Sequence, residues 1–296
     1  MQQSNNDDLP VRDCIVPATR ARWLLLHYHI FKNAGTTIEY VLHRAWGDRF
    51  VRLDGPDPDS ILTAPDILAF LPANPDVIAI SSHHVKYPRP EAPNLIVFDV
   101  CFLRDPLQRL WSFYKFLHRV PPVDSLGEMA RRSDFRPFIE TLVGEHPHLV
   151  NDVQVNLLAN AGAYTRPPSS TDLVVALDVL HRMAVPGVVD IFDESLVVAE
   201  YYLRPAFPEL QFQYVKQNVA PVDYDTTQGA GLREELGEPL YSELRALNRL
   251  DDELVARARE EVRRRYEMMP DREARRADFD RRCEHLRAAH EKMHAT

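Results

Sequence analysis

The chain has 296 residues, and its 35 Lys and Arg against 44 Asp and Glu give a formal net charge of −9. This acidic balance excludes a globally basic nucleic-acid-binding protein. Apolar residues make up 45% of the chain and charged residues 27%, which is close to average usage in soluble proteins. The length suits one large domain with elaborations. The three cysteines lie far apart, so they predict neither a disulfide framework nor a paired-cysteine zinc site.

Three parts of the chain are predicted: a disordered N-terminus over residues 1–21, a domain over 22–268 and a C-terminal helix over 269–296. The N-terminal part lacks the basic and apolar regions of a signal peptide. No stretch approaches the ~20 apolar residues that a membrane-spanning helix needs. We therefore expect a cytoplasmic protein that contacts neither a membrane nor nucleic acid.

Apolar runs bounded by proline or polar residues predict buried strands. These runs cover residues 22–30, 76–82, 94–104 and 187–192. Segments with helical periodicity cover residues 36–42, 105–117, 172–183 and 194–203. We expect a helix after each strand, and a loop over the proline-rich residues 54–75. The alternation predicts an α/β fold, a parallel sheet flanked by helices with a C-terminal helical extension.

The C-terminal segments 239–269 and 271–293 are predicted to be helices laced with charges of both signs. Because the two signs balance there, this tail is a solvated helical face rather than a nucleic-acid-binding arm. The two helices either pack on the domain or mediate a homodimer.

The turn over residues 29–37 lies between a predicted strand and the start of a predicted helix. Backbone N–H groups at a helix start are unsatisfied and the helix dipole adds roughly half a positive charge, so such a turn favours an anion. A glycine lets the backbone approach the ligand, while a lysine and two threonines add a cation and hydroxyl donors. These residues are Lys32, Asn33, Ala34, Gly35, Thr36 and Thr37. The alternative is an ordinary surface turn with a threonine N-cap.

The order of residues in this turn differs from a nucleotide triphosphatase P-loop, in which the lysine follows the second glycine. Here Lys32 precedes Gly35 by three positions. The turn resembles the 5′-phosphosulfate loop of the sulfotransferases that use 3′-phosphoadenosine 5′-phosphosulfate (PAPS), with Phe31 in place of the usual proline. The resemblance implies a P-loop-like sheet and binding of the PAPS 5′-phosphosulfate by residues 32–37.

A second segment carries the same resemblance. Residues 101–114 resemble the F-x-R-D-P-x-x-R-x-x-S-x-Y segment of that family, which implies that Arg104 and Ser112 bind the 3′-phosphate of PAPS. Arg104 is predicted at the carboxyl end of a strand, where open α/β sheets bind ligands, and Ser112 two turns into the next helix. The alternative is a helix-capping ion pair between Arg104 and Asp105.

The histidines that follow the strand over residues 76–82 supply a candidate base. The segment around them resembles the Gly-His-Val-x-Phe stretch of the heparan sulfate and uronyl 2-O-sulfotransferases, and the alignment selects His84 as the catalytic base with His83 in reserve. Two adjacent histidines of an extended chain cannot both face one site. Further along, Asn151 and Gln154 resemble the family's Asn-x-x-Gln helix on the acceptor side, and Lys216 aligns with a loop that closes over the cofactor phosphates.

These resemblances together imply transfer of a sulfuryl group from PAPS to an acceptor hydroxyl, of a carbohydrate or another small molecule. His84 acts as the base, Lys32 stabilises the leaving phosphate, and no metal is needed. Two alternatives remain open: a P-loop-like small-molecule kinase, for which the Walker lysine is absent, and a nucleotide-binding module of the same fold that has lost catalysis.

Overall fold

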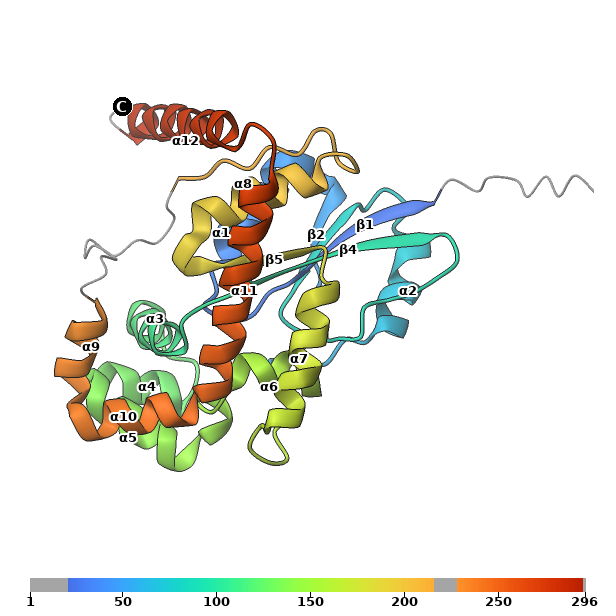
Figure 1. The fold of residues 1–296 in the computed structure, drawn as a ribbon. Helices are drawn as coiled ribbons and strands as arrows, with labels where there is room; N and C mark the ends of the chain where they lie inside the picture. Colours follow the sequence, from blue (N-terminus) through green and yellow to red (C-terminus); the bar gives the residue numbers. More distant parts are fainter. Residues whose placement is uncertain (1–20, 216–227, 295–296) are drawn as a thin grey trace, which may run out of the picture.

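The computed structural model describes residues 21–215 and 228–294. Its centre is a five-stranded, all-parallel sheet with the strand order β2-β3-β1-β4-β5 (Figure 1). The strands are β1 (Arg22–Tyr28), β2 (Phe50–Arg52), β3 (Ala79–Ser82), β4 (Leu95–Leu103) and β5 (Val185–Val188). The prediction of an α/β fold with a parallel sheet is confirmed.

Strand β1 lies at the middle of the sheet because it is apolar on both faces. Leu24, Leu25 and Leu26 are fully buried, as expected of a strand covered by helices on both sides. Leu25 aligns with Ala79 of β3 on one side and with Phe98 of β4 on the other. The carboxyl end of β1 is thereby fixed between the ends of β3 and β4.

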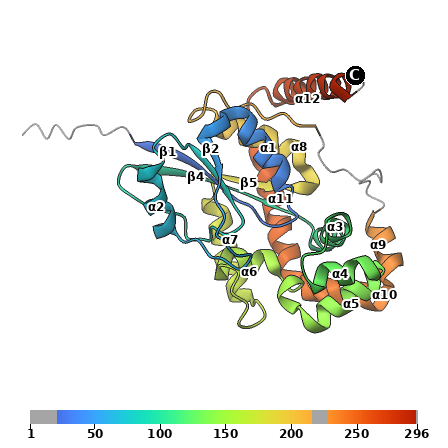
Figure 2. The ribbon, with the colours of Figure 1, turned by 180° about the vertical axis from the view of Figure 1, so that it is seen from behind.

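The helices surround this sheet, and α1 and α7 lie on opposite sides of it (Figures 1 and 2). Helix α11 packs along the edge strand β5, between α7 and α8. The helices are α1 (Gly35–Trp46), α2 (Ala64–Ala73), α3 (Pro106–Arg119), α4 (Ser125–Arg132), α5 (Phe135–Glu145), α6 (Val153–Asn160), α7 (Ser170–Arg182), α8 (Phe192–Leu203), α9 (Gln228–Leu236), α10 (Glu238–Leu247), α11 (Arg249–Met268) and α12 (Arg272–His294).

A second apolar core forms where α3, α4, α5, α9 and α10 gather beyond the carboxyl end of β4 (Figure 1). Phe135 and Phe138 of α5 are fully buried in it, with Leu110 of α3 and Leu236 of α9. This helical cluster therefore stands at the edge of the sheet to which the candidate site residues were assigned.

Several predicted elements need correction. Residues 54–75 include helix α2 rather than only a loop, and the predicted helix over 239–269 is two helices, α10 and α11. The chain passes from β3 to β4 without a helix, whereas a helix was expected there. The strand predicted over 187–192 begins earlier, at Val185. The predicted disordered N-terminus lies outside the described residues apart from residue 21.

The C-terminal helix α12 packs on the domain through α8. Phe279 of α12 is buried, Arg282 forms an ion pair with Glu200 at 3.0 Å, and Arg276 forms one with Asp193 at 3.0 Å. Of the two roles considered for the tail, packing on the domain is thus the one seen in the single chain. Across residues 21–215 and 228–294, no helix combines the length and apolar character needed to cross a membrane.

Candidate functional site

The predicted anion loop lies where the sheet connections diverge. From β1 the chain runs through α1 to β2, on one side of β1, whereas from β4 it runs to β5, on the other side. The carboxyl ends of β1 and β4 are neighbours, with Tyr28 aligned to Cys101. Open parallel sheets bind ligands at such a switch point, outside the carboxyl ends of the strands.

The backbone of the loop is shaped to present N–H groups. Lys32 and Ala34 adopt left-handed conformations with φ of 69° and 61°, and the right-handed helix α1 begins directly afterwards at Gly35. Alternating backbone conformations of this kind form a concave nest that binds anions. Within the described chain, the N–H groups of Ala34, Gly35 and Thr36 have no hydrogen-bond acceptor. They are therefore available to a ligand.

Gly35 is required by the close approach of a buried side chain. A Cβ atom added at Gly35 would lie 1.8 Å from Nε2 of His29, so no larger residue fits without moving the imidazole. His29 is buried and its Nδ1 lies 2.9 Å from Oε1 of Glu39. The backbone of the turn at Gly35 thus packs directly on the buried imidazole of His29.

Arg104 joins the loop from the end of β4, as the sequence predicted. Its Nη1 donates to the carbonyl oxygen of Lys32 at 3.0 Å, and the Nδ2 group of Asn33 donates to the carbonyl oxygen of Phe102 at 2.8 Å. The anion loop and Arg104 are therefore brought together by direct hydrogen bonds across the β1–β4 boundary.

Gln154 of α6 hydrogen-bonds to both Arg104 and the anion loop. Its Oε1 accepts from the backbone N–H of Arg104 at 2.9 Å and from Nδ2 of Asn33 at 2.8 Å. Its Nε2 donates to the carbonyl oxygen of Arg104 at 2.8 Å, so the side chain satisfies both backbone polar groups of Arg104. Gln154 is fully buried between the anion loop and Arg104, and the acceptor-side role that the resemblance implies for it stays a prediction.

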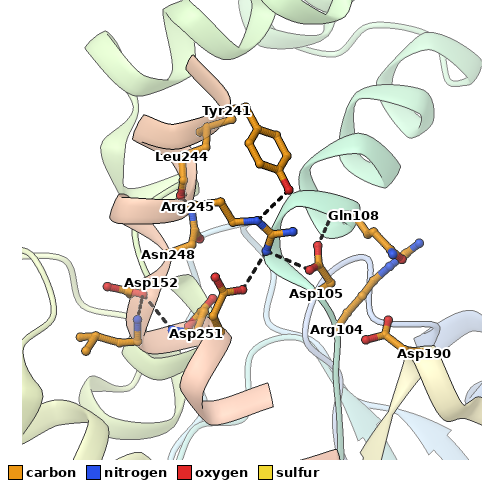
Figure 3. A network of polar contacts seen from close by, with 12 residues as sticks. Arg104, Asp105, Gln108, Asp152, Asp190, Tyr241, Leu244, Arg245, Asn248 and Asp251 are labelled. Carbon is orange, nitrogen blue, oxygen red and sulfur yellow. Dashed lines mark hydrogen bonds and ion pairs between the residues drawn. The ribbon is translucent and has the colours of Figure 1, made fainter. Parts of the chain in front are cut away.

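Helix α6 is in turn held by α11 through reciprocal caps at their N-termini, and Figure 3 shows the cap that Asp152 forms. Asp152, before α6, accepts from the backbone N–H groups of Leu250 and Asp251 at 2.8 and 2.9 Å. Asp251, in the first turn of α11, accepts from the N–H groups of Gln154 and Val155 at 3.0 and 2.8 Å. Each carboxylate satisfies the orphan donors at the start of the other helix.

A further ion-pair network holds the start of α3 against α10 and α11 (Figure 3). Asp105 caps α3 by accepting from the N–H of Gln108 at 2.9 Å. Its carboxylate also pairs with Arg245 at 3.0 Å, and Arg245 pairs with Asp252 at 2.9 Å. Of the alternative considered for this segment, the cap by Asp105 is found, and the ion pair given for its carboxylate is with Arg245.

Lys32 lies over aromatic rings of its own loop and of α3. Its ammonium nitrogen is 4.3 Å from the ring centroid of Phe116 and 5.3 Å from that of Phe31. Burial, together with the positive charges of Arg119 and Arg104, lowers the pKa of Lys32 to about 8. Positive charge from Lys32, Arg104 and Arg119 is therefore gathered at the loop, where an anion would neutralise it. Phe116 and Arg119 were not among the residues predicted for the site, although their helical spacing from Ser112 places them on the same face of α3.

The other predicted ligand residues differ in how far their side chains are exposed. Thr36 is exposed and Thr37 is buried at the start of α1, and Ser112 is half-buried on α3. Ser112 makes no side-chain hydrogen bond within the described part of the chain. Lys216 lies outside the described residues.

The adjacent histidines after β3 face different parts of the structure. The ring of His83 lies against the anion loop, with its centroid 3.7 Å from that of His29 and 5.9 Å from that of Phe31. The ring of His84 turns to the segment after β2, where its Nδ1 lies 2.8 Å from the backbone nitrogen of Gly55. Burial and, to a smaller extent, the neighbouring His29 lower the pKa of His83 to about 4.

Comparison with known proteins adds one relative. A protein of Archaeoglobus fulgidus that is described as uncharacterized is 25% identical over 236 residues, which cover 78% of this chain and 93% of the relative. No family model matches the chain. The similarity therefore extends over most of both chains and carries no activity with it.

Proposed function

We propose that the protein is a sulfotransferase that moves a sulfuryl group from PAPS to the hydroxyl group of a carbohydrate or another small acceptor. The observation that carries this proposal is the hydrogen bond of 3.0 Å between Arg104 and the carbonyl of Lys32, which unites two segments that each resemble a PAPS-binding element. Within residues 21–215 and 228–294, the N–H groups of residues 34–36 have no acceptor and the ammonium of Lys32 has no carboxylate partner, which suits an anionic ligand.

Each residue has a defined task in this proposal. Lys32 and the N–H groups at the start of α1 stabilise the charge that develops on the leaving 5′-phosphate, and one such donor is worth ~3 kcal/mol in the transition state. Arg104 and Ser112 hold the 3′-phosphate, where the guanidinium group gives a bidentate grip. These two residues position the donor and take no part in bond making.

The transfer step needs a base for the acceptor. A histidine after β3 takes the hydroxyl proton as the acceptor oxygen forms its bond to sulfur. The bond between sulfur and the bridging oxygen of the 5′-phosphate breaks, and its electron pair leaves with adenosine 3′,5′-bisphosphate. General-base catalysis of this kind contributes ~10²–10⁴ in rate.

The direct test uses PAPS labelled with ³⁵S, a panel of sugars and simple alcohols, and detection of both the labelled product and adenosine 3′,5′-bisphosphate. Lys32→Met should lower product formation at least ~100-fold, because it removes a donor to the leaving group. Lys115→Met is the matched control, since Lys115 lies on α3 over the ring of Trp111, at 5.2 Å, outside the loop. Consumption of ATP with phosphorylation of the acceptor would instead establish the kinase alternative, and binding of PAPS without any turnover the inactive module.

A further inference from the structure

The two histidines after β3 are held in opposite neutral tautomers. Nδ1 of His84 lies 2.8 Å from the backbone N–H of Gly55, which can only donate, so the proton of the neutral ring is on Nε2. Nδ1 of His83 lies 2.9 Å from the carbonyl oxygen of His29, which can only accept, so the proton of this ring is on Nδ1. His83 therefore keeps its lone pair on Nε2.

A general base needs a free lone pair while its other nitrogen is held by a hydrogen bond that survives proton transfer. His83 meets both conditions because its Nδ1–H bond to the carbonyl is kept when Nε2 becomes protonated. His84 does not, because a proton on Nδ1 would face the N–H of Gly55 and break that bond. His83 also lies against the anion loop, whereas His84 is bonded to the segment after β2.

We infer that His83, rather than His84, is the catalytic base, and that Glu39 is a positioning residue that acts on it through His29. The inference rests on the proposed function for the nature of the reaction. It departs from the alignment, which selects His84, and follows the hydrogen bonds instead.

Glu39 is placed to hold the ends of three strands. From α1, its Oε1 accepts from Nδ1 of His29 at 2.9 Å after β1 and from the hydroxyl of Ser81 at 3.0 Å on β3, and its Oε2 pairs with Arg52 of β2 at 3.3 Å. The backbone carbonyl of His29 is the one that fixes His83. Glu39 thereby holds the side chain of His29, whose backbone carbonyl sets the tautomer of His83.

Glu39 also acts on His83 by its charge. The groups that face His83 come from each neighbouring element: His27 from β1 and His29 just after it, Glu39 from α1, Asp54 after β2, and Lys86, whose ammonium donates to the His83 carbonyl at 2.7 Å. Glu39 and Asp54 oppose the lowering of the His83 pKa that burial and His29 cause. Neutralising Glu39 should therefore lower the pKa of His83 further.

The experiment is nitrogen–proton correlation NMR of the full chain labelled with ¹⁵N-histidine, with His83→Gln and His84→Gln variants to assign the two rings. The inference predicts the Nδ1–H tautomer for His83 and the Nε2–H tautomer for His84 at neutral pH. A reversed pair overturns it, whatever the protein binds. The measurement needs no acceptor, so its failure is distinct from failure of the proposed function, which would appear as absence of adenosine 3′,5′-bisphosphate binding.

Glu39→Gln tests the positioning role in the same spectra. The pKa of His83 should fall by at least half a unit in this variant. Glu209→Gln is the control, because Glu209 contacts Trp46 and Arg49 rather than the groups around His83, and it should leave the titration unchanged. An unchanged His83 pKa in Glu39→Gln would show that Glu39 is not a positioning residue for His83.

The last test measures activity, once an acceptor has been found among the sugars and alcohols assayed with PAPS. His83→Gln should lower kcat at least 100-fold and leave the affinity for adenosine 3′,5′-bisphosphate within twofold, while His84→Gln should change kcat less than fivefold. The opposite ranking would return the base to His84.

Discussion

Replacing Gln154 with leucine removes the side chain that ties Arg104 to the anion loop. The substitution keeps a similar volume but withdraws one partner each from the backbone N–H and the backbone carbonyl of Arg104, now bonded at 2.9 and 2.8 Å. A buried polar group that loses its partner costs about 1–3 kcal/mol, so two such groups predict a loss of about 2–6 kcal/mol in the free energy of unfolding. That is a large share of the ~5–15 kcal/mol typical of a domain.

The assay is urea unfolding followed by circular dichroism, paired with calorimetric binding of adenosine 3′,5′-bisphosphate. Gln108→Leu is the matched control, because the amide of Gln108 makes no side-chain hydrogen bond within the described chain, and it should change stability by less than ~0.5 kcal/mol. The variant Gln154→Leu should also bind the bisphosphate more weakly, since Arg104 and Asn33 lose their common support. A free energy of unfolding within ~0.5 kcal/mol of the wild type would refute the claim that Gln154 stabilises the backbone of Arg104.

Three further predictions concern the loop and its titration. Gly35→Ala should abolish bisphosphate binding in calorimetry, because its methyl group would meet His29 at 1.8 Å, whereas Gly144→Ala, with no atom within 4 Å, should preserve binding and stabilise its helix by ~0.5–1 kcal/mol. Because the pKa of Lys32 is about 8, affinity should fall as pH rises through 8, and Lys32→Met should flatten this dependence; a wild-type affinity that is constant from pH 7 to 9.5 would contradict the role of the ammonium. The pKa of His83 is lowered to about 4, so between pH 6.5 and about 4 the folded state binds fewer protons than the unfolded state, and stability should fall as the pH falls through this range, with a slope of up to ~1.4 kcal/mol per pH unit. His83→Gln should reduce that slope, and an equal slope would show that other groups dominate.

The sequence predicts the central strands and the turn after β1 because both depend on local patterns, whereas the short strand β2 (Phe50–Arg52) was not predicted. The apolar runs at β1 and β4 and the periodicity after Thr36 and Asp105 are signals within a dozen residues. Asp105 caps α3 and Pro106 begins it, as the sequence indicated.

Helix α2 was not predicted because its two prolines suggested a loop, although the sequence also contains the signal for its start. Pro65 and Pro72 suggested a loop, but the first stands in the opening turn, where its missing N–H costs nothing, and the second in the last turn. Thr63 and Asp66 form a capping box, a spacing that marks a helix start and outweighs the prolines.

The support of the site could not be predicted from local patterns. Gln154 lies 121 positions from Asn33 and 50 from Arg104, so only the packed fold shows that one amide serves both. The tautomers of His83 and His84 depend on a carbonyl at His29 and an N–H at Gly55, which are brought to them by separate strand ends. The residue types are visible in sequence, whereas the partner that fixes each is not.

The most direct test of the central claim is calorimetric binding of adenosine 3′,5′-bisphosphate, with 5′-AMP and ATP as controls and Arg104→Ala alongside. The account predicts tight binding that requires the 3′-phosphate and is lost in Arg104→Ala. Absence of binding, or equal binding of ATP, would contradict the sulfotransferase proposal and leave the Lys32 turn as a general anion site.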